Sequence, residues 1–200
     1  MEQTPITVGV PKNALKAALH CVAKNDSRSY LNGVLIELRG EHANIVSSDG
    51  HTLFACKVEV EEGGHTGQAA AIIVPAETVK AALKGLGKWT SNVALSSLPG
   101  GFYRLGDTAF TPIDGRFPDY MRVIPKTVSG KVGAFDPALV LCVSKAVAVF
   151  YGRGRPSLMM NGPTAPAVIV GATADCVGVV MPRRVDGGAK YRGFVPATHA

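Results

Sequence analysis

One pattern occurs three times in the chain, as VPKNALKAAL from Val10, VPAETVKAAL from Val74 and FDPALVLCVSKAV from Phe135. In each copy a valine or phenylalanine stands near a proline, and an apolar, helix-like run follows. The prolines are residues 11, 75 and 137, so the copies are 64 and 62 residues apart. A period this regular predicts one supersecondary unit used three times. The proline suits the first turn of each helix, where its missing N–H is harmless.

Short segments rich in Val, Ile, Leu and Phe follow each predicted helix, with turn residues at their ends, as in strands. They are residues 31–40, 42–50 and 51–61 in the first copy, 92–98, 102–107 and 108–113 in the second, and 157–162, 167–172 and 175–185 in the third. Asp49-Gly50 and Pro99-Gly100-Gly101 are predicted turns. Because a short β-rich stretch also precedes each helix, the repeated unit is predicted to be β-α-β-β-β.

The composition indicates a chain that can bury a core. Of the 200 residues, 46% are hydrophobic and 18% charged, and no stretch is long and apolar enough to span a bilayer. Residues 1–10 lack the cationic and apolar regions of a secretory signal. The cysteines have no C-x-x-C spacing and fall in apolar helix or strand patterns, as buried free thiols do; they are Cys21, Cys56, Cys142 and Cys176. We therefore expect a cytoplasmic protein that contacts no membrane.

The net charge of +6 and the pI near 9.3 favour an anionic partner, most often nucleic acid. One row of lysines on a helix is typical of a solvated face, but basic residues recur on or just after all three predicted helices. Three equivalent rows favour a surface that touches phosphates without reading bases. The rows are Lys12, Lys16, Lys24 and Arg28, then Lys80, Lys84 and Lys88, then Lys145, Arg153 and Arg155.

Four blocks of sequence carry a resemblance to a known family. They are YLNGVL (30–35), SDGHTL (48–53), DGRFPDYMRVIP (114–125) and VMPRRV (180–185). In this order they resemble the bacterial DNA polymerase III beta sliding clamp. The resemblance covers roughly residues 5 to 185, and corresponds to that family's middle domain and the second half of its last domain. It predicts a complete clamp domain over residues 1–125, a half domain over 126–185 and a C-terminal tail over 186–200.

The resemblance implies an α+β fold of the DNA-clamp type, built of three β-α-β-β-β units. The helices of that family line the hole of a ring and face DNA, and its strands form an outer sheet. Residues expected to touch duplex DNA by resemblance are Lys24, Asn25, Arg28 and Tyr30, whereas Ser29 departs from the aromatic residue common in the family.

The resemblance also implies a hydrophobic groove that holds short peptide motifs of DNA polymerases and clamp loaders. Apolar walls with a backbone accessible at glycine suit a peptide. The residues concerned are Leu31, Ser48, Gly50, His51, Thr52, Leu53, Pro118, Arg122, Val123, Val180, Met181, Pro182 and Arg183. Thr52 replaces an arginine common in the family, so the preferred motif is expected to differ. Apart from the resemblance, the same residues read as ordinary core and turn positions.

Signals for catalysis are weak. His51 has Asp49 beside it, but the chain contains no G-x-S-x-G elbow, and its histidines show no H-E-x-x-H spacing. The GRGRP run at 152–156 lacks the Gly-Lys-Ser ending of a phosphate loop and follows a helix. We therefore expect no enzyme activity, no catalytic residue, no metal site and no cofactor.

The sequence thus favours a non-catalytic DNA sliding clamp, a processivity factor that encircles duplex DNA. The alternative is a clamp-like interaction protein that binds clamp partners or a host clamp without encircling DNA. Rings of the resembled superfamily contain twelve units and this chain has three, so we expect a homo-oligomer, as a tetrameric ring. The third helix, apolar nearly all round, also needs a cover. The tail at 186–200 is expected either to add an edge strand between subunits or to fold over the groove.

Overall fold

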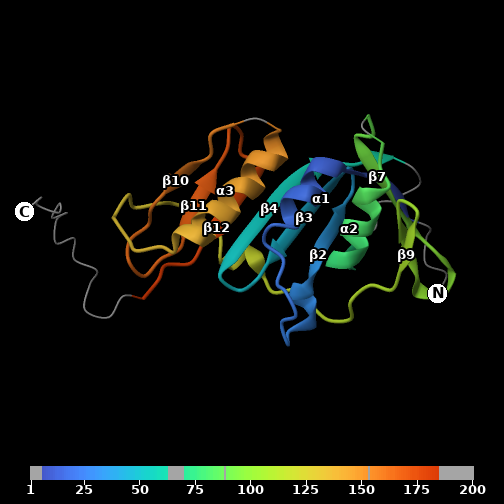
Figure 1. Cartoon of the computed structure of the whole chain (residues 1–200), viewed down its shortest axis with the longest axis horizontal. Coiled ribbons are helices and arrows are strands. Elements are labelled where there is room, and N and C mark those ends of the chain that lie inside the picture. The colour runs from blue at the N-terminus through green and yellow to red at the C-terminus, as the bar shows by residue number, and fades with distance from the viewer. Residues whose placement is uncertain (1–5, 63–69, 88, 153, 185–200) are drawn as a thin grey trace, which may run out of the picture.

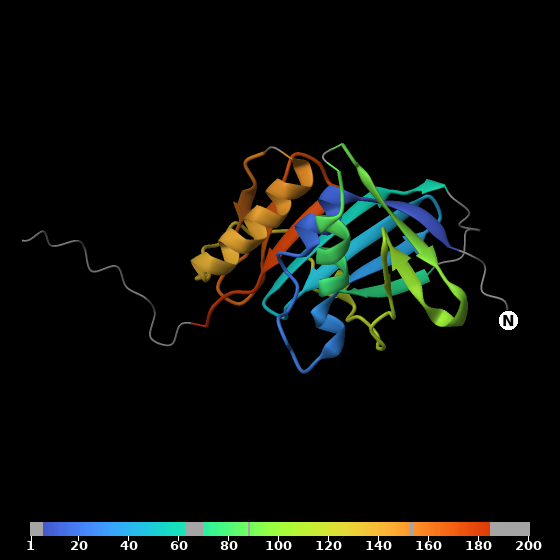
Figure 2. The same cartoon turned by 45° about the vertical axis from the view of Figure 1, so that its right-hand side comes forward.

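The computed structural model describes residues 6–62, 70–87, 89–152 and 154–184, whose strands form two antiparallel sheets. Three α-helices lie on one side of these sheets (Figures 1 and 2). Unit 1 contains β1 (Thr7–Pro11), α1 (Lys12–Ala18), the 3-10 turn η1 (Ser29–Asn32), β2 (Gly33–Arg39), β3 (His42–Ser48), β4 (Thr52–Glu59) and β5 (Glu61–Glu62). Unit 2 contains β6 (Ala70–Pro75), α2 (Ala76–Lys84), β7 (Asn92–Ser97), the 3-10 turn η2 (Pro99–Gly101), β8 (Tyr103–Leu105) and β9 (Thr108–Phe110). The 3-10 turn η3 (Tyr120–Arg122) then leads to unit 3, which contains α3 (Pro137–Tyr151), β10 (Ser157–Met159), β11 (Ala167–Val170) and β12 (Cys176–Val180).

The helices begin where the repeat predicts, with one difference in the place of the proline. Pro11 and Pro75 are the residues before α1 and α2, whereas Pro137 lies in the first turn of α3. In α3 the Asp136 carboxylate accepts a hydrogen bond of 2.8 Å from the Ala138 N–H and so caps the helix. Proline fits both places because neither requires its missing N–H.

Units 1 and 2 exchange their opening strands. β1, at the start of unit 1, pairs with β7 of unit 2, and β6, at the start of unit 2, pairs with β2 of unit 1. Each unit therefore lacks a strand of its own and takes one from its neighbour. The core of either unit contains side chains of the other, so the two halves are expected to fold as one body.

Unit 3 extends the sheet of unit 1. β12 pairs with β4, which gives the seven-stranded order β10-β11-β12-β4-β3-β2-β6; the other sheet is β5-β1-β7-β8-β9. Above this junction α3 packs against α1, and the Asn13 amide donates a hydrogen bond to the Phe150 carbonyl. A strand pair and a helix pair thus hold the third unit to the first.

The third unit differs from the prediction because it has no opening strand. Residues 126–136 are described and contain neither helix nor strand. Units 1 and 2 exchange their opening strands with each other, so no unit among the described residues is left to exchange one with unit 3. Unit 3 is therefore α-β-β-β.

The central sheet is covered on both faces. Alternate residues of its strands, such as Ile36 and Phe54, pack with the three helices in the larger core cluster. The intervening residues, such as Leu35 and Leu53, belong to a second cluster with Phe117 and other residues of the segment before α3. The helices and the segment around η3 therefore lie on opposite faces of this sheet.

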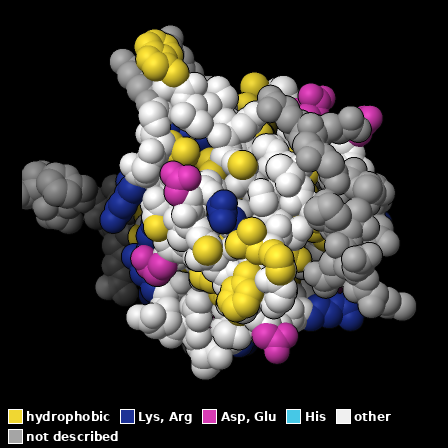
Figure 3. Space-filling model, turned by 90° about the vertical axis from the view of Figure 1, so that its right-hand side faces the viewer, with side chains coloured by type: hydrophobic (Ala, Val, Ile, Leu, Met, Phe, Trp, Pro, Cys, Tyr) yellow, Lys and Arg dark blue, Asp and Glu magenta, His cyan; other side chains and the backbone are white. Residues whose placement is uncertain are grey.

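Unit 2 forms the end of the molecule away from unit 3. Figure 3 looks onto this end, where hydrophobic side chains reach the surface between separated acidic and basic ones. The large exposed hydrophobic residues of unit 2 are Trp89 and Phe102. β9 lies at one end of the five-stranded sheet, and β10 lies at one end of the seven-stranded sheet. These two strands are therefore open edges in different units.

Gly178 allows α3 to rest on β12. A Cβ atom at this position would lie 2.1 Å from Val143 Cγ1 and 3.3 Å from Val147 Cγ2, both buried. We expect Gly178→Ala to lower the free energy of unfolding by about 1–3 kcal/mol, because α3 must shift away from the sheet. Urea unfolding measures this. Gly154→Ala is the control, since a Cβ there meets nothing within 4 Å; equal effects of the two substitutions would contradict the packing argument.

Candidate peptide groove and basic helix face

A pocket of about 180 Å³ lies at the junction of units 1 and 3. The start of β4, the end of β12 and the segment before η3 meet there, and they bring together residues far apart in the sequence. Its lining consists of Arg28, Leu31, Ser48, Gly50, His51, Thr52, Leu53, Phe117, Pro118, Tyr120, Val123, Val179 and Met181. We call this pocket the groove.

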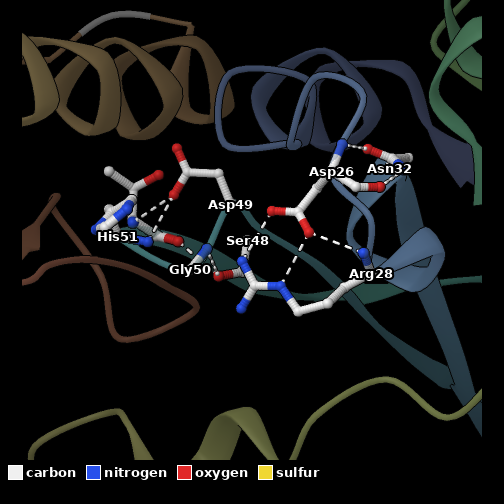
Figure 4. Close-up of polar contacts among 8 residues, drawn as sticks. Asp26, Arg28, Asn32, Ser48, Asp49, Gly50 and His51 are labelled. Carbon is white, nitrogen blue, oxygen red and sulfur yellow. Dashed lines mark hydrogen bonds and ion pairs between the residues drawn. The ribbon is translucent and has the colours of Figure 1, made fainter.

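One wall of the groove is the tight turn between β3 and β4. The Asp49 carboxylate accepts hydrogen bonds from the backbone N–H of His51 at 2.9 Å and of Thr52 at 2.6 Å (Figure 4). The Ser48 hydroxyl donates to the Thr52 carbonyl at 2.7 Å. Gly50 has φ +89, which side-chain-bearing residues rarely adopt. The Asp-Gly turn predicted from sequence is thus held rigid at the groove.

Arg28 extends over this turn from the loop after α1. A Cβ on Gly50 would lie 2.9 Å from Arg28 Nη2, so the guanidinium rests directly on the glycine. Its orientation is set by Asp26, whose carboxylate accepts from Nε at 2.9 Å and from Nη2 at 2.8 Å (Figure 4). These hydrogen bonds lower the pKa of Asp26 to about 2. Asn32 closes the loop by bonding both the N–H and the carbonyl of Asp26.

The floor of the groove is apolar and belongs to the second core cluster. Leu31, Leu53 and Val179 are buried in it. Tyr120 packs beside them and donates its hydroxyl to Glu37 Oε2 at 2.9 Å. Burial, followed by the bond to Glu37, raises the pKa of Tyr120 to about 12. Tyr120 therefore lines the groove with its ring while its hydroxyl is held by Glu37.

The chain leaving β12 passes along the groove. The Met181 N–H donates to the His51 carbonyl at 2.9 Å, which ties this segment to the β3–β4 turn. The Met181 side chain remains 37% exposed. An exposed, flexible thioether above an apolar floor can adapt to a hydrophobic ligand.

Nine of the residues predicted for the groove line it: Leu31, Ser48, Gly50, His51, Thr52, Leu53, Pro118, Val123 and Met181. The other four do not line it. Val180 is fully buried in the helix-side core, Arg122 is exposed in η3, Pro182 is half-buried, and the Arg183 N–H donates to the Ala134 carbonyl.

Sequence reasoning missed four lining residues, Arg28, Phe117, Tyr120 and Val179. Phe117 and Tyr120 stand inside the DGRFPDYMRVIP block, so the block itself was their signal. Arg28 was assigned to DNA. No local pattern relates it to the groove, because its orientation depends on Asp26 and Gly50.

The helices carry exposed cations on the side away from the sheets. α1 buries Ala14, Leu15, Ala17 and Ala18. Lys16, Lys84 and Lys145, one on each helix, are exposed. None of the three makes an ion pair within the described part of the chain. They are therefore available to an anion.

Other predicted DNA contacts already have partners inside the protein. Lys80 pairs with Glu77 at 2.6 Å, and the Lys12 ammonium donates to the Gly87 carbonyl at 3.1 Å. Tyr30 is half-buried in the second core cluster. Lys24, Asn25 and Arg155 are exposed. α2 ends at Lys84, and Lys88, Arg153 and the tail at 186–200 lie outside the described residues.

No helix among the described residues is long and apolar enough to cross a membrane. Among those same residues, no three His, Cys, Asp or Glu side chains cluster in a way that could hold a metal ion.

Two interlocked units with helices on one face define a clamp-type domain, and comparison with known proteins agrees. Solved sliding clamps from Pseudomonas aeruginosa and Bacillus subtilis have this fold, with TM-scores of 0.73 and 0.74 at 18% and 13% identity. The alignments cover 92% and 93% of this chain and 68% and 67% of theirs. Residues 6–119 match the family "DNA polymerase III beta subunit, central domain", and the chain belongs to that family.

Curated relatives include the beta sliding clamps of Escherichia coli K12 and Proteus mirabilis. The first is 34% identical over 118 residues, which is 58% of this chain and 31% of the relative. The second is 31% identical over 183 residues, 80% of this chain and 48% of the relative. The chain therefore spans about a third to a half of the length of these relatives.

Glu37, which holds Tyr120 of the groove floor, is expected to make the stability of the fold depend on pH. Its carboxylate accepts from Arg39 at 2.7 Å, Asn44 at 3.0 Å and Tyr120 at 2.9 Å, and the Arg39 bond is the main reason that its pKa is lowered. A lowered pKa stabilises the fold above the unfolded-state value of about 4.3, and this stabilisation is lost as pH falls through the folded-state value.

We therefore expect Glu37→Gln to reduce stability at neutral pH and to lose this deficit progressively below about pH 4. Urea unfolding of both proteins between pH 3 and 7 checks this. Glu59→Gln, at an exposed position of β4, is the control. Parallel pH curves for wild type and Glu37→Gln would contradict the assignment.

Proposed function

We propose that the chain is a non-catalytic sliding-clamp protein, a processivity factor that surrounds duplex DNA as part of a ring and tethers partners through the groove. The observation that carries the proposal is the placement of exposed lysines and groove on opposite faces of the sheet, in a chain of the sliding-clamp family. A protein of this kind needs one surface for DNA and another for its partners.

The helix face supplies the first surface. Three helices lie on one side of the sheets (Figure 2), and each carries one exposed lysine, which is Lys16, Lys84 or Lys145. Lysine contacts with phosphate are nearly independent of base sequence, so the binding energy varies little along the duplex. Such a surface lets a ring slide.

The groove supplies the second surface. Leu53, Val179 and Tyr120 form an apolar floor, and the polar residues Arg28, Ser48 and His51 also line the groove. A short motif with large apolar side chains suits such a site, because buried hydrophobic anchors give affinity and backbone contacts give orientation. DNA polymerases and clamp loaders are the proposed partners.

Ring closure requires several chains. Three units per chain and twelve per ring call for four copies, and we propose a homotetramer in the cytoplasm. No residue in the described chain needs a catalytic role in this function.

Charge reversal on the helices tests the DNA face. We expect the triple variant Lys16→Glu, Lys84→Glu and Lys145→Glu to bind duplex DNA of any sequence more weakly. The slope of log affinity against log salt should fall by about 0.9 for each phosphate that the variant no longer neutralises. Fluorescence anisotropy with a labelled duplex over a salt series measures both quantities.

The control for this test reverses equal charge on the opposite face. Lys57, Arg104 and Arg116 are exposed. The strand neighbours of Lys57 and Arg104 pack in the helix-side core, so by alternation these two side chains point to the opposite face. Arg116 lines a pocket with Leu35, on the outer face. If this control lowers the salt slope as much as the helix variant does, the helices do not form the DNA surface.

Truncation of Met181 tests the groove. A peptide with glutamine followed by leucine and an aromatic residue is expected to bind in the micromolar range, at about −8 kcal/mol. Met181→Ala should weaken binding by about 1–3 kcal/mol, because it removes apolar surface that the peptide would bury. Met121→Ala is the matched control, because Met121 is exposed but lines a neighbouring pocket. Calorimetry that finds equal affinities for all three proteins would place the peptide elsewhere.

Polymerase stimulation separates a clamp from an interaction protein. The chain should increase product length on a primed circular template when a polymerase and its loader are present. Peptide binding without such stimulation would contradict encirclement and support the alternative, a clamp-like protein that only binds partners.

A further inference from the structure

The strand exchange between units 1 and 2 follows one rule. In both units the residue before the helix lies opposite the first residue of the neighbour's first post-helix strand, as Pro11 opposite Asn92 and Pro75 opposite Gly33. The added strand then runs antiparallel along that neighbour's edge. The exchange is reciprocal, so each unit both donates and accepts.

Unit 3 has both parts of this arrangement, and within the described chain neither forms the corresponding exchanged strand pair. Its first post-helix strand, β10, has β11 on one side and is an edge strand on the other. By position after the helix, Leu158 corresponds to Val34 and Val93, the second residues of β2 and β7. Those valines are 0% and 1% exposed beneath their exchanged strands, whereas Leu158 is 37% exposed. An exchanged strand covers each of the two valines, whereas no strand of the described chain covers Leu158 on that edge.

The segment that would be donated is also present. Residues 129–136 precede α3 as β1 precedes α1. β1 has β5, which follows β4, on one edge; likewise the Ala134 carbonyl accepts a 2.8 Å hydrogen bond from Arg183, which follows β12. The N–H groups of Gly133 and Phe135 donate no backbone hydrogen bond to any described residue. The start of the segment bonds within unit 3, where the Gly130 N–H donates to the Met160 carbonyl at 3.1 Å and the Gly162 N–H donates to the Lys131 carbonyl at 2.8 Å. Residues 134–136 are held on the edge that β1 gives to β5, and their other edge has no strand partner among the described residues.

We propose that unit 3 pairs with unit 3 of a second copy of this chain, each copy adding residues 134–136 to the outer edge of the other's β10. If the register is that of units 1 and 2, Asp136 lies opposite Ser157, Phe135 opposite Leu158 and Ala134 opposite Met159 of the partner copy. A twofold axis relates the copies, because each gives and receives the same segment.

A second copy fits this surface because the chain carries both complementary halves. The large exposed hydrophobic residues described in unit 3 outside the groove are Val132, Leu141, Leu158 and Met159, which lie in the segment before α3, in α3 and in β10. An edge strand flanked by such residues favours pairing with another chain. The inference depends on the fold alone, and not on DNA or peptide binding.

Cysteine cross-linking tests the register. Residues opposite each other in an antiparallel pair have Cα atoms about 4.5–5.5 Å apart, within the range of a disulfide. The double variant Ala134→Cys and Met159→Cys should therefore form a covalent dimer on mild oxidation, seen on a non-reducing gel at twice the 20.8 kDa chain mass and removed by reductant. Neither position faces itself across the axis, so each single variant should stay monomeric on the gel.

Ala134→Cys combined with Phe102→Cys controls for random collision, because Phe102 is exposed in unit 2. If this control or the wild type forms as much cross-linked dimer as the Ala134→Cys and Met159→Cys variant, the proposed register is wrong. Absence of the dimer in the Ala134→Cys and Met159→Cys variant would overturn it equally.

The solution mass gives an independent measurement. Leu158→Lys puts a charge on the proposed interface at an already exposed position, so the fold should survive, which circular dichroism checks. Light scattering should show that this variant has half the mass of the wild-type assembly at the same concentration. Met121→Lys, equally a surface change, should leave the mass unchanged. A wild-type mass of one chain that does not change with concentration would refute the pairing, whatever the outcome of the DNA and peptide tests.

Discussion

The structure depends on the reciprocal exchange of β1 and β6. Each strand completes the sheet of the other unit, so neither unit can bury its core without its neighbour. The exchange also aligns α1 and α2 on one side, because both helices start directly at the end of an exchanged strand. The common helix face is therefore a consequence of how the strands pair, and the lysines on it share their direction for the same reason.

Strand alternation then separates the two surfaces. Side chains such as Phe54 point to the helices, and their neighbours such as Leu53 point to the opposite face. A groove built on the second face cannot interfere with a ligand held by the helices. One sheet, whose side chains alternate between its two faces, thus supports both parts of the proposed function.

The groove itself depends on the junction between units 1 and 3. β12 must pair with β4 before Val179 and Met181 can reach the β3–β4 turn. The same junction leaves β10 as an edge at its far side. The contact that completes the groove thus also directs the open edge outward, toward the place where we infer a second copy.

The sequence by itself determined the units and the turns, because repeats, Asp-Gly turns and apolar alternation are local signals. Nine lining residues of the groove could be named only because the four blocks resemble the family, since on their own these residues read as core and turn positions. Only the tertiary structure decided that Arg28 rests on Gly50, that Lys80 is held by Glu77, and that unit 3 lacks its opening strand. Those outcomes depend on which side chains and strands meet in space. Partners that are distant in the chain produce no periodic pattern in the sequence, so the sequence alone does not predict them.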